Sequence, residues 1–177
     1  MKKNKRFLQL KWWFHPVFRF IVLSGMTLLV LVLITSLSKV ESFFIQTTSF
    51  ILSKILSFLQ IPYKPSLLDA QFSFQILDGT KLNFLIIPDC TGIYPLSILI
   101  SFLVGYPVAW NRKWMGLLIA FIATGVVNFI RLTLLIMIGR HSLPAFHLWH
   151  TLIWQSSFVL LIAGFYFGWT QWINKKG

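Results

Sequence analysis

Long apolar runs alternate with short polar segments along most of the 177-residue chain. Four of these runs can form a helix that crosses a hydrocarbon core of ~30 Å at about 1.5 Å per residue. They cover residues 17–37, 92–110, 114–138 and 149–173. The pattern predicts an all-α polytopic membrane protein with about four transmembrane helices, built as a single membrane-embedded domain over residues 1–177.

Residues 42–60 have a different pattern. Serine and glutamine recur every three or four positions and draw one polar stripe along a helix, made by Ser42, Gln46, Ser49, Ser53, Ser57 and Gln60. An amphipathic helix of this kind lies in the membrane interface or packs its polar stripe against a wet cavity. If the segment instead crosses the membrane, the chain has five spans. The stripe favours four spans, with residues 42–60 on the outer face.

A short β-structure is predicted between this helix and the next apolar run. Pro62 and Pro65 end the helix, because proline lacks a backbone N–H. The stretch "AQFSFQILDGTKLNFLII" then alternates apolar and polar residues on both sides of Asp78-Gly79, which is a strong hairpin signal. The amphipathic helix and this small β-hairpin therefore form a cap directly before Cys90.

The chain is strongly basic, with 16 Lys and Arg against four Asp and Glu. In a soluble protein this excess would indicate a nucleic-acid partner. In a chain with these apolar runs, basic residues instead sort by membrane side and attract lipid head groups. We expect the lipid bilayer as a partner and no nucleic acid. The number of basic residues on each side of the membrane does not decide between a topology of four spans and one of five.

Three chemically active side chains converge in both topologies. Cys90 is the only cysteine, so it cannot form an internal disulfide. We expect it in the first turn of the helix over 92–110, where the positive end of the helix dipole favours a thiolate. Arg131 lies inside an apolar span, where a charge is costly and indicates a functional site. With His150 as proton carrier, this trio suits acyl transfer through a cysteine nucleophile.

The same residues also fit a non-catalytic protein. Cys90 can be a small core residue, and Arg131 a structural partner of Asn128 or of backbone carbonyls. The protein would then be a non-enzymatic membrane subunit of a surface-polymer export or assembly system. His147 lies three residues before His150 and is its rival as the base. We expect neither a metal nor an organic cofactor.

Three segments resemble the exosortase/archaeosortase family of membrane transpeptidases: "PDCTGIYPL", "NFIRLTLLI" and "HTLIWQSSF". They are similar, in order and spacing, to the family's Cys-Ser/Thr-Gly-Ile, its Asn-x-x-Arg and a His that opens the last helix. The resemblance implies cleavage of C-terminal sorting signals through a Cys thioester, and transfer of the product to a surface acceptor. It implies Cys90 as nucleophile, His150 as general base and acid, and Arg131 as the stabilising cation.

The same resemblance implies location and partners. The protein would lie in the inner (cytoplasmic) membrane with its active site on the outer face, and membrane-anchored proteins with sorting signals would be its substrates. Asp89, Asn128 and His147 flank the trio and are further candidates for substrate binding. The recognised motif and the choice between an acceptor and water stay open.

Overall fold

The computed structural model describes residues 16–68, 71–77 and 82–175. Its long elements are helices, and the strands form one small sheet. The helices are α2 (Pro16–Thr35), α3 (Ser38–Phe58), α4 (Ile93–Gly105), α5 (Trp110–His141) and α6 (Leu143–Lys175). The strands are β1 (Tyr63–Leu68), β2 (Gln71–Ile76) and β3 (Asn83–Leu85), and a 3₁₀ turn, η1, spans Pro88–Cys90. The prediction of a mainly helical membrane protein with a small β-structure is confirmed.

Three of the helices, α2, α5 and α6, are long and apolar enough to cross a membrane. Helix α4 is equally apolar but has only 13 residues, or about 20 Å, and is shorter than the predicted range of 92–110. It ends because Tyr106 adopts an extended conformation, with φ −67° and ψ 132°. The next residue is Pro107, and a residue before proline is disfavoured in the helical region.

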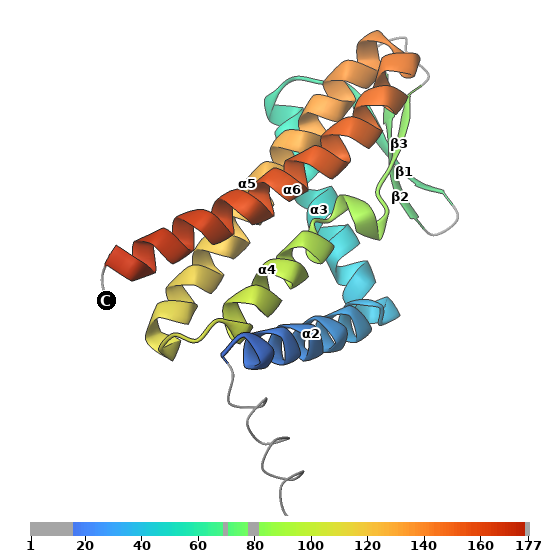
Figure 1. Cartoon of the computed structure of the whole chain (residues 1–177). Helices are drawn as coiled ribbons and strands as arrows, with labels where there is room; N and C mark the ends of the chain where they lie inside the picture. Colours follow the sequence, from blue (N-terminus) through green and yellow to red (C-terminus); the bar gives the residue numbers. More distant parts are fainter. Residues whose placement is uncertain (1–15, 69–70, 78–81, 176–177) are drawn as a thin grey trace, which may run out of the picture.

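The helices pack as two neighbouring pairs (Figure 1). Helix α2 lies along α4, and α5 lies along α6. Helix α5 has 32 residues, about 48 Å, and is therefore much longer than α4. Its first part packs against α4, and its later part extends past Cys90 beside the sheet. The sheet thus covers one end of the helical bundle.

The sheet has the strand order β1-β2-β3, and both pairs are antiparallel. The predicted hairpin is the β2–β3 pair, with Ser73 opposite Leu85, while its turn at Asp78-Gly79 lies outside the described residues. Strand β1 was not predicted because it contains Pro65. A proline is tolerated there since β1 is the edge strand of the sheet.

The sheet and the outer part of α5 share one hydrophobic core. Leu132, Leu135 and Ile136 of α5 pack with Phe84 and Ile86, and Cys90 belongs to the same cluster. Helix α3 completes this core through two fully buried leucines, Leu52 and Leu56. The core therefore holds the segment before Cys90 against α5.

Two serines of the stripe on α3 bond within the helix, whereas the buried Ser49 hydroxyl has no hydrogen-bond partner among the described residues. Ser53 donates to the Phe50 carbonyl at 2.7 Å, and Ser57 donates to the Ser53 carbonyl at 2.9 Å. Such bonds to the preceding turn satisfy a serine hydroxyl without water. The residues that α3 buries are Thr48, Ser49, Leu52 and Leu56. The packed face is therefore offset from the predicted stripe and shares only Ser49 with it.

Candidate active site

Cys90 is held in a short turn between the sheet and α4. Its N–H donates to the Ile87 carbonyl at 2.8 Å, and the Thr91 hydroxyl donates to the Pro88 carbonyl at 2.7 Å. Helix α4 begins only at Ile93. The prediction that Cys90 lies in the first turn of this helix is therefore wrong. The residue belongs to the separate turn η1, two residues before the Gly92 cap of α4.

Gly92 fits this position for two reasons. Its φ of +75° is left-handed, which L side chains rarely adopt. A Cβ here would also lie 3.3 Å from Cγ of Asn128 and 3.5 Å from Cγ2 of Thr124. Both residues are on α5, so Gly92 lets the backbone after Cys90 approach that helix closely.

Asn128 ties the Cys90 segment to α5. Its side chain is 1% exposed, and its Nδ2 donates to the Cys90 carbonyl at 2.9 Å. Arg131 follows three residues later, on the same face of the helix. One turn of α5 therefore carries a group that fixes the Cys90 backbone and a cation beside it.

Arg131 is buried where α5 meets α6. The residue is 2% exposed, and its guanidinium carbon lies 4.9 Å from the ring centroid of Phe158 on α6. A cation over an aromatic face is attracted by the ring quadrupole. The charge of Arg131 acts on the Cys90 thiol and on His150. Arg131 therefore connects the two groups that the sequence separates by 60 positions.

The Cys90 thiol lies in a dry environment. The residue is 4% exposed, and its Sγ is 4.0 Å from the Leu85 carbonyl oxygen. Burial raises the pKa of Cys90 because it penalises the thiolate, and the charge of Asp89 acts in the same direction. The N–H bond to Ile87 and the charge of Arg131 lower this pKa but do not outweigh burial. At neutral pH the thiol is therefore protonated.

The two histidines near the start of α6 occupy different positions. His150 is half-buried, and its ring centroid is 5.8 Å from that of Phe146, which itself packs at 6.0 Å against Phe84 of β3. His147 is exposed, at 5.6 Å from the same phenylalanine. Asp89 is also exposed. Half-buried His150 is thus placed against the sheet, while His147 and Asp89 face outward.

The chain as a whole matches the protein-family model described as transmembrane exosortase (Exosortase_EpsH), over residues 9–169. The protein belongs to the transmembrane exosortase family. The matched range contains Cys90, Arg131 and His150. No curated protein and no solved structure matches the chain.

Two aromatic residues of this exosortase contact the predicted site residues but were not predicted from the sequence. Phe158 supports Arg131, and Phe146 joins His150 to the sheet. A signal for Phe146 exists, because residues four apart share a helix face and Phe146 lies four before His150. Nothing in the sequence marks Phe158 among the 18 phenylalanines. Within the described part of the chain, no three His, Cys, Asp or Glu residues are grouped so that they could hold a metal ion.

Proposed function

We propose that this exosortase is a membrane cysteine transpeptidase or protease that cleaves the C-terminal sorting signals of exported proteins. Family membership supports a membrane transpeptidase-type role. The observation that carries the specific assignment is buried Arg131, whose charge acts on both Cys90 and His150. A nucleophile, a proton carrier and a fixed cation are the groups that acyl transfer needs.

In the first step, His150 takes the proton of the Cys90 thiol, and Sγ attacks the carbonyl carbon of the scissile peptide bond. Arg131 stabilises the negative charge that develops on the carbonyl oxygen. The C–N bond then breaks, and His150 returns the proton to the leaving nitrogen. The products are a thioester on Cys90 and the released sorting signal with a free amine.

In the second step, an acceptor amine or a water molecule attacks the thioester carbonyl. His150 removes a proton from the attacking group and returns it to the departing sulfur. With an amine the product is a new amide, and the protein acts as a transpeptidase. With water the product is a carboxylic acid, and the protein acts as a protease. Both regenerate the Cys90 thiol.

The length of α5 supports an active site on the outer face of the cytoplasmic membrane. Arg131 lies roughly 30 Å along the helix from Trp110, which matches the thickness of a hydrocarbon core. Arg112 and Lys113 stand at the opposite, starting end of α5, and short cytoplasmic loops are rich in such residues. With this end inside, the trio and the sheet lie at the outer boundary.

The exposed groups suggest how a substrate approaches. Asp89, which directly precedes Cys90, and His147, which lies near His150, are both exposed, and we assign them contacts with the sorting motif. Asn128 is buried against Cys90, so we assign it the positioning of the nucleophile. Membrane-anchored proteins with a C-terminal helix and a basic tail would present their cleavage site at this depth.

The test is co-expression with a candidate substrate that bears such a helix and tail, with the mass of the substrate as readout. Cys90→Ala is expected to abolish processing, and His150→Ala to slow it by about 10²–10⁴-fold, the usual contribution of a general acid–base group. His147→Ala is the matched control on the same helix, with an expected loss of about tenfold or less. Unchanged processing by Cys90→Ala would overturn the proposal, and a larger loss in His147→Ala than in His150→Ala would reassign the base.

A further inference from the structure

A second charged site lies at the end of the bundle opposite Cys90. A pocket of about 400 Å³ opens between the start of α2, the end of α4 and the start of α5. Its lining includes two cationic residues, Arg19 of α2 and Lys113 of α5, beside the backbone of Gly105 and Tyr106. Helix α4 begins just after Cys90 and ends at this pocket, so the two sites are separate.

The positive charge of this pocket is not balanced by its lining. None of the four carboxylates, which all lie between residues 41 and 89, is among the described residues around it. Lys113 is 7% exposed, donates to the Val104 carbonyl and lies 4.9 Å from the Trp110 ring. Arg19 is exposed at the mouth. An exposed guanidinium next to a fixed ammonium is suited to an anion with several oxygens.

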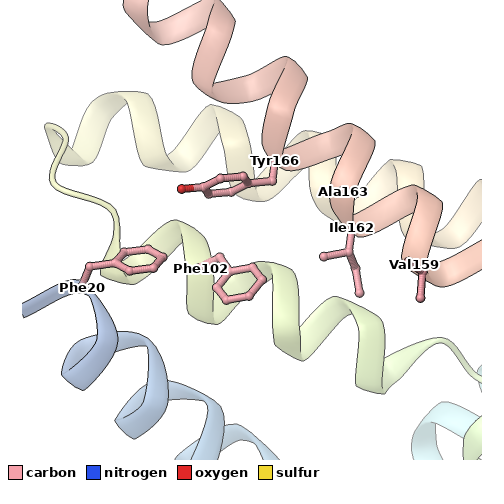
Figure 2. Close-up of a pocket in the computed structure, with 6 residues that line it drawn as sticks. All are labelled: Phe20, Phe102, Val159, Ile162, Ala163 and Tyr166. Carbon is pink, nitrogen blue, oxygen red and sulfur yellow. The ribbon is translucent and has the colours of Figure 1, made fainter. Parts of the chain in front are cut away.

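An apolar pocket of about 420 Å³ adjoins the charged one, between α2, α4 and α6 (Figure 2). It is lined by Phe20, Phe102, Val159, Ile162, Ala163 and Tyr166. The two pockets are neighbours, because the ring of Tyr106, from the charged lining, is 6.3 Å from that of Tyr166, from the apolar lining. Figure 2 shows the apolar pocket running from Phe20, near the connection between α4 and α5, to Val159.

We propose that one anionic phospholipid binds here, with its phosphate on Arg19 and Lys113 and an acyl chain along the apolar pocket. Basic pockets between transmembrane helices bind the head groups of anionic lipids. A free phosphate ion would use the charged pocket but would leave the adjoining apolar one unexplained. The lipid would link α2 to α4, α5 and α6, and its binding does not depend on the proposed peptide cleavage.

The test uses the full chain in nanodiscs made of equal parts phosphatidylglycerol and phosphatidylcholine, followed by native mass spectrometry. The wild type is expected to retain one phosphatidylglycerol in clear preference to phosphatidylcholine. Arg19→Gln should reduce this preference about fivefold, since a basic residue contributes on the order of 1 kcal/mol to anionic-lipid binding. Lys175→Gln removes the same charge from the end of α6, outside the pocket, and should leave the preference unchanged.

Equal retention of the two lipids, or equal losses in both variants, would overturn the proposal. A second arm separates the sources of phosphate in detergent-solubilised protein. Short-chain phosphatidylglycerol is expected to raise the melting temperature more than inorganic phosphate does. An equal effect of inorganic phosphate would contradict the lipid assignment.

Ala163→Phe fills the apolar pocket and should weaken retention of phosphatidylglycerol. Undiminished retention in this variant would contradict the placement of the acyl chain in that pocket.

Discussion

Helix α5 carries two buried cations, Lys113 in its first turn and Arg131 about two-thirds of the way along it, and their surroundings differ. Lys113 and Arg131 are 7% and 2% exposed, and each lies 4.9 Å from the centroid of an aromatic ring. Lys113 donates to the Val104 carbonyl in the last turn of α4. The charge of Arg131 instead interacts with the side chains of Cys90, Asp89 and His150.

A buried cation in a membrane helix is therefore not evidence of catalysis by itself. A lysine that bonds the last carbonyls of a helix satisfies groups that lack partners there and complements the helix dipole. Lys113 therefore stabilises the end of α4. The charge of Arg131 instead acts on Cys90 and His150, which supports the role proposed for it.

The largest difference between the two cations is expected when each charge is removed in turn. Arg131→Gln is expected to lower the rate of substrate processing about 10²–10³-fold, as the loss of an oxyanion donor does. Lys113→Gln should instead lower stability by about 1–3 kcal/mol, because a buried carbonyl loses its charged donor. Its activity should fall only in step with the folded fraction. Processing rates and melting temperatures of both variants check this, and an equal loss of rate per folded molecule would erase the distinction.

The glycines at the two ends of α4 are expected to differ in the same way, one affecting activity and the other stability. Gly92→Ala forces a left-handed φ on alanine, at roughly 1–2 kcal/mol, and pushes against Asn128. We expect its activity to fall further than its stability. Gly105→Ala would clash with Ser24 and lie 3.0 Å from the Phe20 backbone oxygen, so we expect it to separate α2 from α4 and to lose mainly stability.

Gly125→Ala is the matched control for both changes, because a Cβ at Gly125 meets nothing within 4 Å. Alanine there should be neutral or stabilising by about 0.5–1 kcal/mol, since it favours a helix over glycine. Activity per folded molecule separates the variants. An equal loss of activity per folded molecule in Gly105→Ala and Gly92→Ala would contradict the expectation that only the Gly92 end of α4 supports the site.

A smaller effect is expected in the titration of Cys90. Its alkylation rate should rise as the pH increases through its raised pKa, because only the thiolate reacts. Arg131 lowers and Asp89 raises this pKa. Arg131→Gln should therefore move the midpoint to higher pH and Asp89→Asn to lower pH, whereas Lys113→Gln should not move it. Iodoacetamide reports Cys90 alone, since the chain has no other cysteine, and shifts in the opposite directions would contradict the placement of these charges.

Much of the fold follows from the spacing of apolar residues. The runs over 17–37, 114–138 and 149–173 correspond to α2, α5 and α6 because helix formation in a bilayer satisfies every backbone group. Strand β1 and the early end of α4 were missed for one physical reason, which is proline. Pro65 predicted only the end of a helix but lies in the edge strand of a sheet, and Pro107 ends α4 after 13 residues.

Candidate site residues could be named from the sequence, but their contacts could not. A lone cysteine, a charge within a span and a histidine at the start of a helix stand out in an apolar chain. The bond from Asn128 to the Cys90 carbonyl depends on how α5 packs against η1. The ring of Phe158 under Arg131 depends on how α6 packs against α5. Such contacts between distant segments leave no local pattern.

The central claim is that Cys90 carries the substrate as a thioester. The most direct measurement is the intact mass of the protein, isolated in acid from cells that also express a candidate substrate. We expect an adduct on Cys90 with the mass of the substrate up to its cleavage site, removed by hydroxylamine and absent from Cys90→Ala. Cleaved substrate accumulating in cells that carry only Cys90→Ala would contradict it.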